Sequence, residues 1–170
     1  MKYHERVGTE MRNFTKSKGG FTIIEVVLVL AIAGLIFLIV FLAVPALQRS
    51  QRDTQRKSDL GRFMSQISSF QSNARGNVPA ATAAAIETAP GGLVPKYLTA
   101  NGDSFEDPKG GAYTFVYGTG AAPTADGEIR YAVNARCSTT NPGDVSAGSG
   151  ARQVAASIKL EGGGAYCQQN

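Results

Sequence analysis

The residue that most needs a chemical explanation is Glu25, a carboxylate near the start of an apolar run that extends from Phe21 to Leu47. A charge in hydrocarbon is costly and usually marks a functional position, where a cation can offset it. The structural alternative is a glutamate at the membrane edge that snorkels to the headgroups without a partner. Gly19 and Gly20 precede the run. Glycine can adopt backbone conformations that other residues rarely adopt, so the chain is unusually free to change conformation a few residues before the acid.

Few other residues could form a catalytic or metal site. The only histidine is His4, so the rest of the chain has no histidine for a catalytic or metal constellation. Serines and acids are scattered without a local pattern. Asp126, Glu128 and Asp144 could contribute to a calcium site, but acids are common in turns. We therefore predict no enzyme activity, no cofactor and no metal.

The apolar run is long enough to cross a membrane. Its roughly 27 residues match the ~30 Å hydrocarbon layer with some tilt. Residues 1–20 carry five basic and two acidic side chains, +3 of the total formal charge of +4. This asymmetry predicts a single pass through the cytoplasmic membrane with the N-terminus inside. A signal peptide has a shorter apolar region and a small-x-small cleavage site, and no such site follows here.

Residues 48–75 predict an amphipathic helix that continues the apolar one. Apolar side chains recur at helical spacing, at Leu60, Phe63, Met64, Ile67, Phe70 and Ala74. Gly76 and Pro79 indicate the end of a helix that spans about 21–75. Five of the six cations on this segment could contact DNA, but their spread around the helix favours a solvated face or pairs between subunits: Arg49, Arg52, Arg56, Lys57 and Arg62.

Residues 76–170 predict a small β domain. Residues 77–92 indicate a connection with a short helix at 82–88, and 93–111 indicate a loop. Three segments have the composition of strands, at 112–118, 127–137 and 152–162. The fold class is therefore α+β, with a long N-terminal helix packed on a small antiparallel sheet of about three strands.

Cys137 and Cys167 are the only cysteines. With the N-terminus inside, both lie in the oxidising compartment, which favours a disulfide. The bridge would close a loop of about 30 residues and contribute roughly 3–4 kcal/mol.

The stretch "KGGFTIIE" (18–25), followed by the span and the amphipathic helix, resembles the class III signal of the type IV pilin and pseudopilin superfamily. The resemblance is strong over about 16–47, extends in outline to 75, and covers only architecture in the β domain. It implies cleavage between Gly20 and Phe21 and methylation of the new Phe21 amine. It also implies that Glu25 pairs with the Phe21 ammonium of a neighbouring subunit, which fixes the register of assembly.

Gly34 and Pro45 are the positions at which the resemblance implies a kink or loss of helical order on assembly. Gly34 matches a glycine familiar in these helices. Familiar pilins place their proline three residues earlier, where this chain has Leu42. The limits of any such segment therefore differ from the family pattern.

The resemblance implies a structural subunit of a pilus that serves adhesion, twitching motility or DNA uptake. Expected partners are identical subunits, minor pilins, a prepilin peptidase that also methylates, and a membrane platform with a cytoplasmic ATPase. The precursor would reside in the membrane, and the product in an extracellular pilus; nothing in the sequence supports DNA as a partner.

Two other interpretations stay open. "FEDPKGGAYTFVYG" (105–118) loosely resembles a stretch of the pseudopilins of type II secretion or competence systems, whereas a disulfide near the C-terminus is more typical of pilins. The third interpretation is an uncleaved, signal-anchored domain that binds something at the cell surface.

Overall fold

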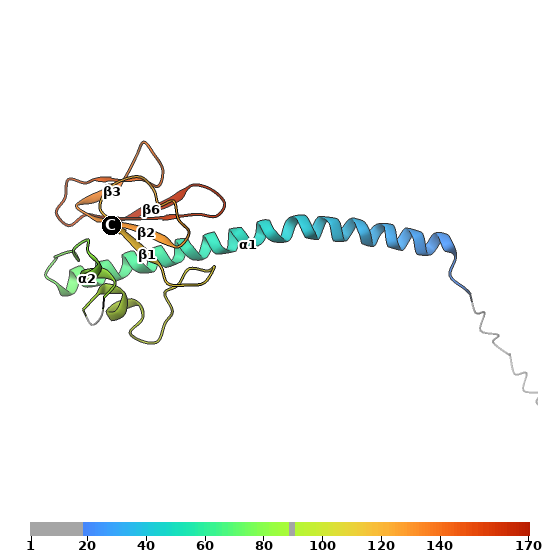
Figure 1. Ribbon diagram of the computed structural model, residues 1–170, viewed down its shortest axis with the longest axis horizontal. Coiled ribbons are helices and arrows are strands. Elements are labelled where there is room, and N and C mark those ends of the chain that lie inside the picture. The colour runs from blue at the N-terminus through green and yellow to red at the C-terminus, as the bar shows by residue number, and fades with distance from the viewer. Residues whose placement is uncertain (1–18, 89–90) are drawn as a thin grey trace, which may run out of the picture. The chain divides into compact units, whose positions relative to one another are not determined.

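The computed structural model describes residues 19–88 and 91–170, and the chain divides into two compact units, Met1–Leu42 and Ala43–Asn170 (Figure 1). The predicted leader lies outside the described residues except for Gly19 and Gly20, and so does His4. Each unit is described by itself below.

One helix, α1, extends from Ile23 to Asn73, close to the predicted 21–75. It ends because the next residues adopt left-handed backbone, with φ of 57° at Arg75 and 85° at Gly76. The Gly76 N–H then donates a hydrogen bond of 2.7 Å to the Gln71 carbonyl. This satisfies one of the carbonyls that a helix end leaves without a partner.

The main sheet of the second unit has four strands in the order β1-β2-β5-β6. They are β1 (Thr114–Tyr117), β2 (Glu128–Val133), β5 (Val154–Lys159) and β6 (Ala165–Gln169). The pairs β2–β5 and β5–β6 are antiparallel, but β1 and β2 are parallel. The α+β class is confirmed, whereas the fully antiparallel arrangement is wrong.

The parallel pair arises from the segment between β1 and β2. A tight hairpin would make the two strands antiparallel, but the chain leaves the sheet after β1. Gly120 exchanges two backbone hydrogen bonds with Val145, of 2.8 and 2.9 Å. The chain then returns to the starting end of β1 before β2 begins.

A second, two-stranded sheet consists of β3 (Ala135–Cys137) and β4 (Val145–Ala147). Asn134 has a φ of 51°, and this left-handed residue splits the predicted 127–137 strand into β2 and β3. A disulfide joins Cys137 to Cys167, and thus β3 to β6, as predicted.

Two short helical elements lie between α1 and the sheet. Helix α2 (Ala83–Ile86), within the predicted 82–88, is capped by Thr82, whose side chain accepts a hydrogen bond from the Ala85 N–H. A five-residue π-helix, Val94–Leu98, occupies part of 93–111, where a loop was expected.

The core forms where the apolar stripe of α1 meets the sheet. Leu60, Phe63 and Ile67 have no exposed surface. The Phe63 ring lies 5.4 Å from that of Phe115 and 5.6 Å from that of Tyr131, between ring centroids. The predicted packing of the stripe is confirmed, and the chain has a pilin-like architecture.

We expect the disulfide to stabilise this small unit substantially. Because it joins residues 30 positions apart, its loss in the C137S/C167S variant should lower the free energy of unfolding by about 3–4 kcal/mol. Urea unfolding of the full chain in detergent micelles, followed by tyrosine circular dichroism, measures this. Ser146→Ala on β4 is the matched control; equal midpoints for the two variants would refute the expectation.

Candidate processing and assembly site

The junction predicted for cleavage is open to solvent. Gly19 and Gly20 are exposed and lie outside regular structure, and no heavy atom lies within 4 Å of a Cβ built on either glycine. The Phe21 side chain is 87% exposed. The peptide bond between Gly20 and Phe21 therefore has the access and backbone freedom that a protease cleft requires.

Thr22 and Glu25 form a capping box at the start of α1. The Thr22 N–H and hydroxyl donate to Oε2 of Glu25, at 3.2 and 3.1 Å, and the Glu25 N–H donates to the Thr22 hydroxyl at 3.3 Å. These reciprocal bonds satisfy donors that a helix start otherwise leaves without partners. They explain why the helix begins at Ile23.

The capping role of Glu25 was missed by the sequence analysis, although Thr-x-x-Glu before an apolar run is its signature. It differs from both sequence-based explanations, the intersubunit pair and the snorkelling acid. Among the described residues, only Oε2 of the carboxylate accepts hydrogen bonds. The other oxygen, Oε1, is therefore available to a donor from outside the chain.

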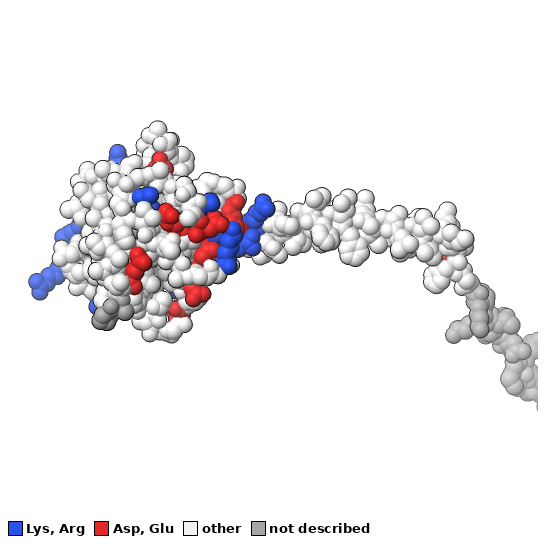
Figure 2. Space-filling model, in the orientation of Figure 1, with Lys and Arg blue, Asp and Glu red and all other residues white. Residues whose placement is uncertain are grey.

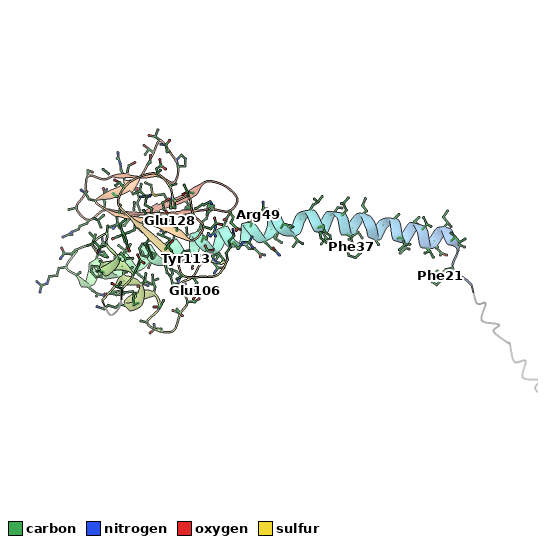
Figure 3. The ribbon with its side chains drawn as sticks, viewed as in Figure 1. Phe21, Phe37, Arg49, Glu106, Tyr113 and Glu128 are labelled. Carbon is green, nitrogen blue, oxygen red and sulfur yellow. A yellow bond between two sulfur atoms is a disulfide. The ribbon has the colours of Figure 1, made fainter. Side chains whose placement is uncertain are left out.

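The first half of α1 exposes its apolar side chains around its whole circumference (Figure 3). Ile23 is 86% exposed, Phe37 66% and Phe41 80%. A soluble helix shows one apolar stripe and one polar face. This segment has no polar face, so another apolar phase or other helices must cover it.

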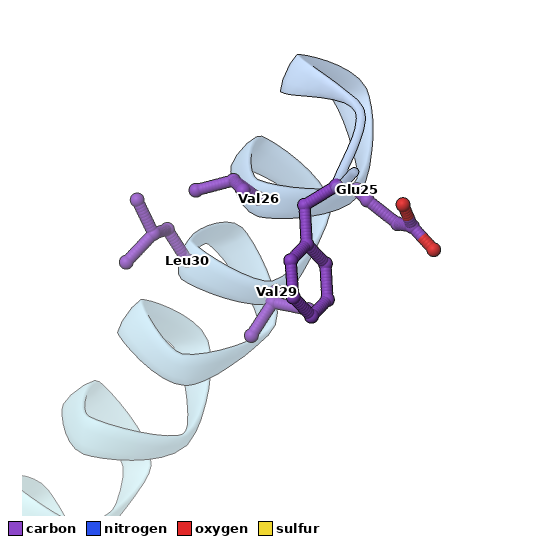
Figure 4. Close-up of a pocket in the computed structure, with 5 residues that line it drawn as sticks. Glu25, Val26, Val29 and Leu30 are labelled. Carbon is purple, nitrogen blue, oxygen red and sulfur yellow. The ribbon is translucent and has the colours of Figure 1, made fainter. Parts of the chain in front are cut away.

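A shallow hollow of about 390 Å³ lies beside Glu25, lined by Phe21, Glu25, Val26, Val29 and Leu30. Figure 4 shows the Glu25 carboxylate pointing away from Val26 and Leu30. The lining is otherwise apolar, so the hollow would accept an aliphatic or aromatic side chain beside the carboxylate.

Gly34 and Pro45 both lie within α1, which continues through them. Gly34 has no heavy atom within 4 Å of its would-be Cβ. Pro45 has no N–H to donate to the Phe41 carbonyl, which weakens the helix at this turn. Their role in kinking or melting stays a prediction.

Within the described part of the chain, α1 is the one helix long and apolar enough to cross a membrane. The predicted anchor coincides with its exposed first half. The orientation of that anchor stays a prediction.

In the second unit, a buried ion pair fixes α1 to the segment before β1. Arg56 has no exposed surface, and its Nε and Nη2 donate to the Asp107 carboxylate at 2.6 and 2.9 Å. Hydrogen bonding to Asp107 raises the pKa of Arg56 above its ordinary value. This bidentate geometry is the strongest that the two groups can form.

Asp59 lies about one helical turn after Arg56 on α1 and accepts a hydrogen bond of 2.9 Å from the Tyr113 hydroxyl. Burial, followed by this hydrogen bond, raises the pKa of Tyr113 above its ordinary value. Asp107 and Tyr113 both belong to the stretch that loosely resembles pseudopilins, and both hold the helix in place.

A mixed-charge cluster lies beside α1 in the second unit, where Figure 2 shows adjoining red and blue side chains. Arg52 pairs with Glu161 at 2.6 Å, and Lys109 pairs with both Asp126 and Glu161. Hydrogen bonds from Lys109 and Lys159 lower the pKa of Asp126 to about 2.

Two of the three acids considered for calcium make separate contacts with other groups. Asp126 pairs with two lysines, and Asp144 accepts the Ala122 N–H at 2.7 Å. No group of three potential metal ligands occurs within residues 19–88 and 91–170.

The expectation that the cations of the amphipathic helix form a solvated face is wrong for Arg56, which is fully buried. Arg52 is half-buried in an ion pair, whereas Arg49 and Lys57 are exposed. Arg56 lies four residues before Leu60, on the line of the apolar stripe, so its burial follows the helical period. The sequence does not reveal its partner, because Asp107 lies 51 residues away.

Comparison with known proteins adds no relatives: no family model matches the chain, and no curated protein or solved structure is significantly similar to it. What the structure does show is a long apolar N-terminal helix on a small sheet with a C-terminal disulfide. This pilin-like architecture is established by geometry alone.

We expect Asp107→Asn to destabilise the second unit by about 3–5 kcal/mol, because it leaves the Arg56 guanidinium buried without a carboxylate. Urea unfolding of the full chain in micelles measures the loss. Asp126→Asn is the matched control; it removes partly exposed ion pairs and should cost no more than about 1 kcal/mol.

If Asp107→Asn does not fold, the double variant R56M/D107L distinguishes a buried charge from a packing defect. Replacing both partners by apolar groups should recover most of the stability. Equal losses for D107N and D126N would contradict the importance of the buried pair.

Proposed function

We propose that the chain is a structural subunit of a type IV pilus filament, made as a membrane-anchored precursor. It is cleaved after Gly20, methylated at Phe21 and polymerised through its N-terminal helix. The observation that carries the proposal is a helix with apolar side chains on every face, joined to an open Gly-Gly-Phe junction and to a pilin-like second unit.

Cleavage would convert the junction into a charged terminus. The ammonium of Phe21 would appear one turn from the Glu25 carboxylate, whose Oε2 is already engaged by Thr22. Oε1 can then accept a hydrogen bond from the ammonium of a neighbouring subunit. In an apolar filament core an unpaired charge is strongly unfavourable, so the pair would reject other axial registers.

Polymerisation would exchange lipid for other copies of the helix. Transfer of this apolar surface from water into a filament core would be favourable by tens of kcal/mol, at ~25 cal/mol/Å². Lipid already covers it in the membrane, so much of that gain is offset. Extraction therefore calls for a membrane platform with a cytoplasmic ATPase, and maturation for a prepilin peptidase that also methylates.

A pseudopilin of a secretion or competence system is the second candidate. Asp107 and Tyr113, in the stretch that loosely resembles pseudopilins, form buried bonds to Arg56 and Asp59. The disulfide between Cys137 and Cys167 favours a pilin instead.

The mass of the N-terminal peptide tests the proposal first. We expect a peptide that begins at Phe21 and carries one added methyl group, abundant in material sheared from the cell surface. Mass spectrometry of sheared and membrane fractions measures it. A Phe21 start confined to membranes would favour a pseudopilin, and an intact leader in both fractions would refute cleavage.

The Glu25→Gln variant tests the assembly role. Glutamine can keep a capping box but carries no charge, so processing should continue while sheared filaments fall at least tenfold. Quantitative immunoblots of both fractions measure this. Thr22→Ala is the comparison, because it removes the capping hydroxyl and keeps the charge, so filament yield should fall less than in E25Q. Normal filament yield from E25Q would rule out the ion pair.

A further inference from the structure

A polar hollow of about 330 Å³ lies at the C-terminal end of α1, lined by Gln71, Ser72, Arg75, Gly76 and Arg152. Two guanidinium groups contribute to this lining and no carboxylate does. Blue side chains project from this left-hand end of the second unit in Figure 2, whereas red and blue mix at the opposite end.

The Arg152 side chain lies against the backbone at Gly76. A Cβ at position 76 would stand 2.7 Å from Cζ and 2.8 Å from Nη2 of Arg152, and the φ of Gly76 is +85°. Any larger residue would therefore displace the guanidinium and strain the backbone. Glycine at this position lets the arginine lie flat over the turn.

The backbone of Arg152 is held as well. Its carbonyl accepts hydrogen bonds from Gln71 Nε2 at 2.9 Å and from Asn170 Nδ2 at 3.2 Å. The segment before β5 is thereby fixed to the last turns of α1. These bonds fix the backbone from which the exposed Arg152 side chain reaches the hollow.

Neither arginine is engaged in an ion pair within residues 19–88 and 91–170, in contrast to Arg52, Arg56 and Arg62. The carbonyl end of α1 contributes only about half a negative charge. Two full positive charges exceed this amount, so the hollow has a net attraction for anions.

We propose that Arg75 and Arg152 form a binding site for a phosphate group at this end of the second unit. A guanidinium offers paired N–H donors that match two phosphate oxygens, and Arg residues are preferred for such recognition. The hollow is larger than one phosphate, so a phosphate ester fits as well as the free anion. The inference does not depend on the filament proposal.

The test titrates inorganic phosphate into the full chain in non-ionic detergent micelles and follows the arginine Nε–Hε signals by NMR. The Arg75 and Arg152 signals should shift together and saturate with one dissociation constant. Arg152→Gln should weaken that binding about tenfold, the loss expected for one charge-assisted contact. Because only the side chain changes, both bonds to the Arg152 carbonyl stay in place.

Arg136→Gln is the matched control, since Arg136 is exposed on β3 and its loss changes the net charge equally. It should leave phosphate binding unchanged. Shifts without saturation, or equal weakening by R136Q and R152Q, would overturn the site. If R152Q unfolds, Arg75→Gln repeats the comparison.

A fluorescent DNA duplex distinguishes two sources of the phosphate. Binding that is lost in R152Q but kept in R136Q assigns the site to a polyphosphate backbone, with an affinity that falls steeply with salt. Saturable phosphate binding without duplex binding assigns it to a small phosphate ester. Binding of neither probe overturns the proposal.

Discussion

A helix with apolar side chains on every face cannot stay in water, and this constraint shapes the whole chain. Each fully buried Leu, Ile or Phe contributes about 1.5–3 kcal/mol relative to exposure, and the first half of α1 exposes apolar side chains from Ile23 to Leu47. Polar groups therefore concentrate at its two ends. At the start of the helix, the capping box of Thr22 and Glu25 supplies hydrogen-bond partners for backbone N–H groups. After the apolar segment, Arg52 is the first residue of α1 that forms an ion pair among the described residues.

The second unit solves a different problem, which is how a small sheet holds a long helix. Its apolar contact covers about three turns, from Leu60 to Phe70. The preceding turns are joined by Arg56 to Asp107 and by Asp59 to Tyr113. A buried ion pair gives little net stability compared with apolar packing, but a broken one is very unfavourable. The pair therefore fixes where along the helix the sheet can pack.

Periodicity predicted the parts of the fold that depend on local sequence. The stripe from Leu60 to Ile67 repeats at the helical period, and β2 and β5 have strand composition, so both were found. The strand β6 (Ala165–Gln169) escaped because glutamines and a cysteine dominate it, and its stability comes from pairing with β5. The parallel β1–β2 pair and the buried Arg56 depend on contacts distant in sequence, which one sequence does not reveal.

Glu25 shows how one residue can serve two structural states. Within the single chain its Oε2 caps the helix through Thr22, which lowers the cost of keeping a carboxylate near the apolar segment. The same bonds hold the side chain in one place with Oε1 free. A carboxylate already fixed by its own chain loses little freedom when it meets an ammonium from another copy. Capping and pairing are therefore complementary, and the cap prepares the acid for assembly.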